Sequence, residues 1–144
     1  MTLEEARYRM LDQGFDCAQT VFSAFAEDLD LDEETALRIA AGFGGGMHKG
    51  DMCGCVTGGL MALGMKYGWS EEGDKVGKDL MNGKAQEYER RFCEACGGIR
   101  CRELLEADVS TPEGRMLAGE RVPQRCPGFA VAACEILEEM LNED

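Results

Sequence analysis

The sequence has few of the residues on which many protein functions depend. One histidine, one tryptophan and three prolines occur in 144 residues, and 15 Lys and Arg face 28 Asp and Glu, for a net charge of −13. This deficit of positive charge argues against nucleic acids and anionic membranes as partners, because phosphates require clustered Lys and Arg. Partner surfaces should be neutral or basic. No apolar run approaches the roughly 18 residues of a membrane span, so we expect no membrane insertion.

The length predicts one domain over residues 1–144, large enough to bury its own core. Hydrophobic residues make up 44% of the chain, which excludes a disordered acidic tail. The first seven residues read as an acidic helix start and lack the basic and then apolar layout of a signal peptide. We therefore expect a cytoplasmic protein.

Apolar residues recur at helical spacing almost throughout, and no β-alternation of any length is present. We predict an all-α, single-domain bundle of about six to seven helices, with a glycine-rich loop at 42–50 before the central helix. Asp16 and Asp32 are expected helix caps, and 110–113 is a helix-start signature. The other expected features are a first helix that ends near residue 14, an apolar helix over 60–67, a charged helix over 72–95, a short turn from 101 and a last helix from 126.

Cysteine is the residue that stands out, with eight in the chain, or about one in eighteen. This share is below that of disulfide-built secreted scaffolds, which are also usually shorter. In a reducing compartment, such an enrichment indicates metal binding or redox chemistry.

Four cysteines each lie at or just before the first turn of an expected helix: Cys17, Cys53, Cys101 and Cys126. Free N–H groups and the helix dipole favour a thiolate there, and they also suit an anionic iron–sulfur cluster. Backbone N–H groups of four glycines are candidates to approach the bound anion, namely Gly44, Gly45, Gly46 and Gly54. The alternative is that these cysteines are small packing residues at helix ends.

The other four cysteines have weaker claims. Cys55 would point about 200° away from Cys53 within one helix, so both serve one site only if Cys53 lies in the loop. Cys93 and Cys96 form a C-x-x-C on one helix face, which is a redox or metal spacing and makes them candidate additional ligands. Cys134 lies in an apolar stripe, where core packing is the better interpretation.

The only histidine, His48, lies in the glycine-rich loop and is a candidate accessory ligand or proton donor. Its neighbour Lys49 is followed by Gly50, so the loop is not a P-loop. Zinc fits the sequence less well than an iron–sulfur cluster. Structural zinc sites usually use two close cysteine pairs, whereas three of the four helix-start cysteines are isolated.

Segments along nearly the whole chain resemble the redox-active protein family named for its C…GCAxxG…C…C pattern. The segments that carry the resemblance are 16–19, 41–46, 53–58, 60–64, 66–68, 101–105, and Cys126 ahead of 135–139. The resemblance implies that the four signature cysteines are Cys17, Cys53, Cys101 and Cys126. Either Cys53 or Cys55 fits the central position, and Val56 stands where one register expects Ala. Cys93, Cys96 and Cys134 are additional to the pattern.

Similar domains occur beside transporter genes and in haem-containing redox proteins of anaerobes, where iron–sulfur binding has been proposed. The resemblance therefore implies electron transfer with a protein partner that the sequence does not identify.

Three hypotheses follow, and they leave open whether the chain is an enzyme. The first is an electron-transfer protein with an iron–sulfur cluster, [2Fe–2S] by preference, on the four signature cysteines, with His48 or Lys49 tuning its charge. The second is a cluster-free thiol–disulfide oxidoreductase in which Cys53 attacks and Cys17, Cys55, Cys101 or Cys126 resolves. The third is a structural zinc-bound interaction domain. A homodimer is a further expectation.

Overall fold

The computed structural model describes residues 1–143, and this part of the chain contains no β-strand. The prediction of an all-α fold of six to seven helices is therefore confirmed. The helices are α1 (Leu3–Arg7), α2 (Cys17–Ala24), α3 (Glu33–Ala40), α4 (Gly54–Tyr67), α5 (Lys75–Cys96), α6 (Cys101–Leu105) and α7 (Pro112–Leu141). Wider turns cover 8–12 and 46–50. Within residues 1–143, no helix combines the length and the apolar character that crossing a membrane requires.

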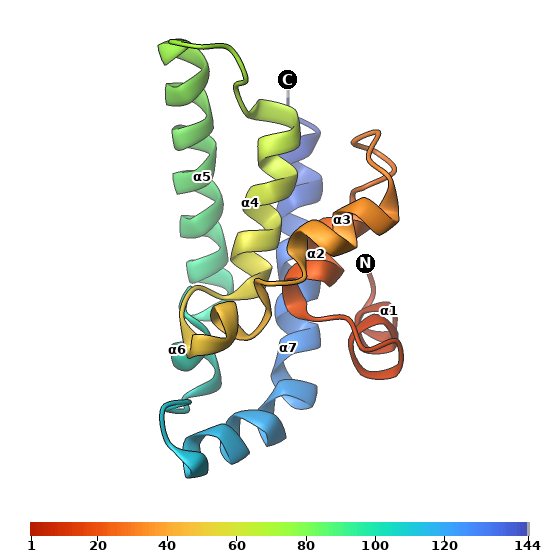
Figure 1. Ribbon diagram of the computed structural model, residues 1–144, viewed down its shortest axis with the longest axis vertical. Coiled ribbons are helices and arrows are strands. Elements are labelled where there is room, and N and C mark those ends of the chain that lie inside the picture. Colours follow the sequence, from red (N-terminus) through yellow and green to blue (C-terminus); the bar gives the residue numbers. More distant parts are fainter. Residues whose placement is uncertain (144) are drawn as a thin grey trace.

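Helix α4 lies between the two long helices α5 and α7 and contacts both of them (Figure 1). Helix α2 packs on α4 and α7, and α3 packs on α2. The largest side chains of the core are Leu63 of α4, Tyr88 and Phe92 of α5, and Leu137 and Met140 of α7, all fully buried. The short helix α6 lies near the lower end of α5 and packs on α7. The central helix is thus surrounded by the elements that carry the cysteines.

Side-chain caps fix the starts of the helices. Asp16 accepts a hydrogen bond from the Gln19 backbone N–H at 2.8 Å, and the Gln19 side chain accepts one from the Asp16 N–H at 3.1 Å. This reciprocal pair satisfies N–H groups that a helix start leaves free. Asp32 and Thr111 cap α3 and α7 by accepting from the N–H three residues on, without a reciprocal bond, so the three helix starts predicted at these residues are confirmed.

Two predicted boundaries are wrong. Helix α4 begins at Gly54, not near residue 60, so the motif 54–59 is helical despite its glycines. Helix α7 runs unbroken from 112 to 141, whereas the sequence predicted a new helix at Cys126. Pro123 and Pro127 each remove one N–H from the helix, and this favours a bend over a termination. Figure 1 shows that the first part of α7 runs across the base of the molecule before the helix turns upward.

The glycine-rich loop is irregular, as predicted. Gly45, Gly46, Met47 and His48 all have φ between 59° and 62°, a left-handed conformation that costs a non-glycine residue energy. A Cβ at Gly46 would collide with the backbone of Asp51, so the loop folds closely onto the segment before α4.

Candidate functional site

The site begins at the crossing of α2 and α4. Gly54 and Gly58 are one turn apart on α4, and both face Ala18 of α2. A Cβ at Gly54 would stand 2.9 Å from Cβ of Cys17, and one at Gly58 would stand 2.6 Å from the Ala18 carbonyl oxygen. Small residues spaced by one turn allow two helix backbones to approach closely. This close approach brings the first turn of α2, with Cys17, against the first turn of α4, with Cys55.

Cys17 lies at the centre of a group of thiols. The thiols of Cys126 and Cys55 donate hydrogen bonds to its sulfur, and they hold the pKa of Cys17 well below the usual range. Cys55 also contacts Cys53. The same contacts, together with burial, raise the pKa values of Cys55 and Cys126. The arrangement therefore favours a thiolate at Cys17 and protonated thiols around it.

The structure shows where Cys53 and Cys126 lie relative to the helices that carry them. Cys53 is the N-cap of α4 and has a non-helical ψ of 135°, so it lies outside the helix that contains Cys55. The condition under which both cysteines could serve one site is therefore met. Cys126 reaches the group from inside α7, and the expected position at a helix N-terminus is wrong.

A short antiparallel pairing holds Cys53 beside Cys101. The N–H of Cys53 donates to the Ile99 carbonyl at 2.8 Å, and the N–H of Cys101 donates to the Asp51 carbonyl at 2.7 Å. Burial raises the pKa of the Cys101 thiol to about 11, with smaller electrostatic contributions from the neighbouring Cys53 and Cys17. Cys101 therefore belongs to the same group of sulfur atoms.

Two arginines of α7 tie α6 to the site. Arg121 donates to the carbonyls of Leu105 and Glu106, both at 2.7 Å, and Arg125 donates to the Leu104 carbonyl at 2.9 Å. These carbonyls lie at the C-terminal end of α6, where no intrahelical donor remains. The arginines thereby fix α6, and with it Cys101, relative to Cys126 of α7. No pattern in the sequence identifies these arginines, because only the tertiary structure brings α6 to this turn of α7.

A cavity of about 220 Å³ opens among the sulfur atoms, and Cys17, Cys101 and Cys126 all line it. We call it the sulfur cavity. The rest of its lining is mostly apolar and comes from Met10, Leu11, Phe15, Leu105, Val109 and Val122. Apolar walls lower the local dielectric constant and thereby strengthen electrostatic interactions inside the cavity. Three of the four predicted signature cysteines thus line one mostly apolar cavity.

Tyr88 of α5 supports the group from the other side of α4. Its hydroxyl donates to the Cys55 carbonyl at 2.7 Å, and the tyrosine is fully buried. A Cβ at Gly59 would collide with the Tyr88 ring, so this glycine makes room for the contact. The glycines at 54, 58 and 59 therefore serve helix packing on two sides of α4, and their spacing in the sequence is the signal by which this role can be found.

The remaining predicted site residues lie around this group. Gly44 packs against the side chain of Asp16, which caps the helix of Cys17, and Gly45 lines the sulfur cavity. His48 is exposed and lies near Asp16, whose pKa is raised mainly by burial. Cys134 is buried in the core with 1% exposure, in agreement with the packing role predicted for it.

The C-x-x-C pair lies at the end of α5. Cys93 is exposed and Cys96 is half-buried. Burial raises the pKa of Cys96 to about 11, and the neighbouring Cys53 adds to the shift. The pair is therefore close to the thiol group but outside the sulfur cavity.

The donor chemistry of the thiol group fits an iron–sulfur cluster or zinc, since thiolates are the preferred ligands of both. The sulfur atoms contact one another in pairs around Cys17. Across residues 1–143, no three His, Cys, Asp or Glu side chains converge on one point in an arrangement ready to hold a metal ion. Binding a cluster would therefore require rotations of cysteine side chains toward the cavity.

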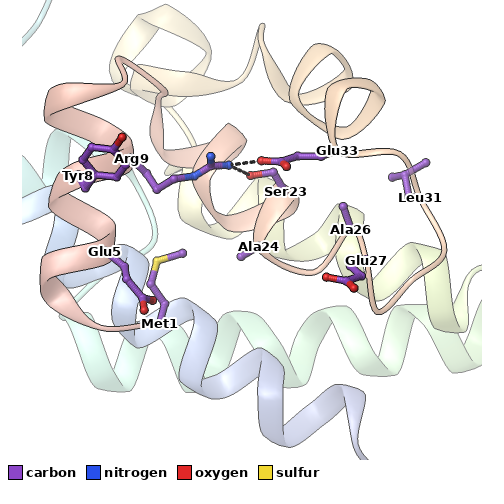
Figure 2. A pocket seen from close by; sticks show the side chains of 10 residues that line it. All are labelled: Met1, Glu5, Tyr8, Arg9, Ser23, Ala24, Ala26, Glu27, Leu31 and Glu33. Carbon is purple, nitrogen blue, oxygen red and sulfur yellow. Dashed lines mark hydrogen bonds and ion pairs between the residues drawn. The ribbon is translucent and has the colours of Figure 1, made fainter.

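A second hollow, of about 490 Å³, lies between the first 10 residues and α2 and contains no cysteine (Figure 2). In it Arg9 donates to the Ser23 hydroxyl at 2.7 Å and to the Glu33 carboxylate at 3.0 Å. The guanidinium also stacks on Phe15, 4.7 Å from the ring centre. These contacts tie the start of the chain to α2 and α3 and help to hold α2 in place.

Comparison with known proteins identifies the family. Residues 15–140 match the model of the family described as "Putative redox-active protein (C_GCAxxG_C_C)". The chain belongs to this family. The match includes all four predicted signature cysteines of this C_GCAxxG_C_C protein, and the resemblance predicted from the sequence is confirmed. No curated protein and no solved structure matches this chain significantly.

Proposed function

We propose that this C_GCAxxG_C_C protein is an electron-transfer protein that holds an iron–sulfur cluster, of the [2Fe–2S] type, on Cys17, Cys53, Cys101 and Cys126. The observation that carries the proposal is the sulfur cavity, in which cysteines of α2, α6 and α7 meet in an apolar space. When bound, such a cluster supplies reversible electron transfer at a potential set by its surroundings.

The chain's own residues provide the surroundings that such a group needs. The mostly apolar lining of the cavity limits the polar surroundings of the sulfur atoms. Arg121 and Arg125 fix α6, and the crossing at Gly54 and Gly58 fixes α2 against α4. Because the ligands come from distant parts of the chain, loading should also stabilise the fold. Cys55, in contact with both Cys17 and Cys53, is the alternative fourth ligand.

A second function is favoured by the contacts of Cys17. Two thiols donate to its sulfur, so a cluster-free oxidoreductase would use Cys17 as the attacking thiolate, with Cys55 or Cys126 as the resolving thiol. The sequence-based version of this hypothesis used Cys53 as the attacking group. The two versions make opposite predictions for the Cys17→Ser and Cys53→Ser variants in turnover of a disulfide substrate.

The deciding experiment is to measure iron, acid-labile sulfide and the visible spectrum of the full chain purified without oxygen. We expect iron with matching sulfide in the wild type, its loss in Cys17→Ser and Cys126→Ser, and its retention in Cys134→Ala. Cys134 is a matched control, because it lies on α7 but outside the cavity. Far-ultraviolet circular dichroism shows whether each variant is folded.

The other outcomes assign the site differently. A folded protein with neither iron nor sulfide would favour the cluster-free oxidoreductase over the cluster-binding protein. Zinc alone would support a structural zinc-bound domain. Cys53→Ser and Cys55→Ser variants, compared in iron content, determine which of the two thiols is the ligand.

The electron partner should present a neutral or basic surface to this acidic protein. A homodimer is proposed as well, and Val76 and Leu80 of α5 support it as exposed apolar residues one turn apart. Light scattering during size-exclusion chromatography of the wild type and Val76→Glu measures the oligomeric state. A monomeric wild type would eliminate the dimer.

A further inference from the structure

The C-x-x-C pair of α5 has no role in the sulfur cavity, and its surroundings differ from those of the other cysteines. All eight cysteines lie in the part of the chain that the structure describes, and Cys93 alone among them is exposed. Cys96 is half-buried and packs against the hydrophobic core. One thiol is thus open to an external reactant, and the second lies just behind it.

The helix brings the two thiols to one face. Residues three apart in an α-helix are neighbours, at a separation that a disulfide can span. Cys96 is also the last residue of α5, which ends at Gly97 with a φ of +93°. No further helical turn follows Cys96, so the local backbone can adjust when a bond forms between the two sulfur atoms.

The segment that carries the pair is richer in arginine than the rest of the chain, although Arg91, Arg100 and Arg102 also form ion pairs with carboxylates outside it. Residues 89–103 contain four arginines and three glutamates, whereas the whole chain has a net charge of −13. Arg90 lies three residues before Cys93, and therefore on the same face of α5, where it pairs with Glu94. An anionic small-molecule disulfide meets less repulsion here than over most of the surface.

We propose that Cys93 and Cys96 form a second redox site, which exchanges with small anionic disulfides at the surface. This inference goes beyond the cluster function and does not depend on it. The site also lies next to the buried thiols, because the N–H of Cys53 donates to the carbonyl of Ile99, three residues after Cys96.

The exchange is balanced in atoms and electrons. The Cys93 thiolate attacks one sulfur of the external disulfide, whose S–S bond breaks, and the first thiolate leaves and takes up the proton that Cys93 released. Cys96 then loses its proton and attacks the Cys93 sulfur, which forms the Cys93–Cys96 bond and expels the second thiolate, protonated in turn. The external disulfide gains two electrons, and the cysteine pair loses two. An external thiol pair reverses both steps.

The test incubates the full chain in glutathione buffers of defined ratio of disulfide to thiol, followed by acid quenching, alkylation and mass spectrometry. Trypsin releases residues 92–100, a fragment with these two cysteines and no others. We expect this fragment to lose two hydrogens reversibly as the ratio rises. In Cys96→Ser the reaction should stop at a mixed disulfide of Cys93 with glutathione, and Cys134→Ala should behave as the wild type.

Three results would overturn the proposal. The first is free thiols in the wild-type fragment at every ratio, and the second is glutathione that stays on Cys93 while Cys96 is intact. The third is loss of iron from the folded Cys93→Ser/Cys96→Ser variant, which would make the pair metal ligands. Failure of the cluster proposal is separately visible, because Cys17→Ser tests iron binding and leaves the 92–100 fragment unchanged.

Discussion

Gly58 of α4 lies so close to Ala18 of α2 that a Cβ added to the glycine would stand 2.6 Å from the Ala18 carbonyl oxygen. That oxygen belongs to the backbone and cannot move out of the way as a flexible side chain would. The contact fixes the distance between the two helices whose first turns carry Cys17 and Cys55. The packing of the core and the geometry of the thiol group therefore depend on the same glycine.

Gly58→Ala should destabilise the protein by about 1–3 kcal/mol, the usual cost of overpacking a core. Gly64→Ala is the matched control, because a Cβ at Gly64 of the same helix would meet nothing within 4 Å. Replacement of a helical glycine by alanine at such a position should stabilise by about 0.5–1 kcal/mol. Urea denaturation measures both changes, and equal effects of the two variants would contradict the importance of the crossing.

Tyr88→Phe removes the hydrogen bond from the buried hydroxyl to the Cys55 carbonyl. We expect a loss of about 1 kcal/mol of stability, since a neutral buried hydrogen bond contributes about that much. The control is Tyr8→Phe, because Tyr8 is 54% exposed. Thermal unfolding distinguishes the two variants. A Tyr88→Phe protein as stable as Tyr8→Phe would show that the bond adds nothing.

Arg125→Ala should loosen α6 and expose Cys101. The substitution removes the donor to the Leu104 carbonyl and an ion pair with Glu106 at 2.9 Å. In the metal-free reduced protein, we expect iodoacetamide to alkylate Cys101 several times faster than in the wild type, read by mass spectrometry of the tryptic fragments. Arg90→Ala is the control, because Arg90 pairs only with Glu94 on the surface of α5. If Cys101 reacts at the same rate in both variants, the arginine does not position α6.

Stability of the metal-free protein should fall as the pH rises above about 9. Burial raises the pKa of Cys134 from 9.0 to about 12 in the folded protein. Between these values the unfolded chain releases a proton that the folded chain retains, so unfolding becomes more favourable with increasing pH. Below pH 9, the buried Cys134 thiol contributes its full stabilisation. Above pH 9, each such thiol lowers the free energy of unfolding by at most about 1.4 kcal/mol per pH unit.

Urea denaturation of the reduced protein at pH 8 and pH 10 measures this dependence. Cys134→Ala lacks the group and should lose less stability over the same interval than the wild type. An equal loss in both proteins would assign the dependence to the other buried thiols.

Much of the secondary structure follows from short-range chemistry and could therefore be predicted. The caps at Asp16, Asp32 and Thr111 bond to N–H groups three residues away, and the sequence shows both partners. The failures occur where tertiary packing outweighs local preference. Gly58 and Gly59 lower helix propensity, yet their lack of side chains allows α2 and Tyr88 to pack against α4, which makes the helix favourable.

For the cysteines too, one part of their arrangement could be predicted from the sequence and another part could not. Their number and family pattern indicated redox chemistry, and the resemblance predicted the four signature positions without any coordinates. That Cys126 reaches Cys17 from the middle of a helix was not predicted, because Pro127 suggested a helix start at Cys126. The cluster itself stays a prediction.

The sequence alone determined the helical fold, the helix caps and the family, because each depends on residue type and on spacing within a few positions. Only the tertiary structure decided which thiols touch, which one becomes the thiolate and which arginines fix α6. Those outcomes depend on how closely helices approach across 15 to 109 residues of chain, from Arg121–Glu106 to Cys17–Cys126. That approach is governed by burial and shape, which no local pattern in the sequence records.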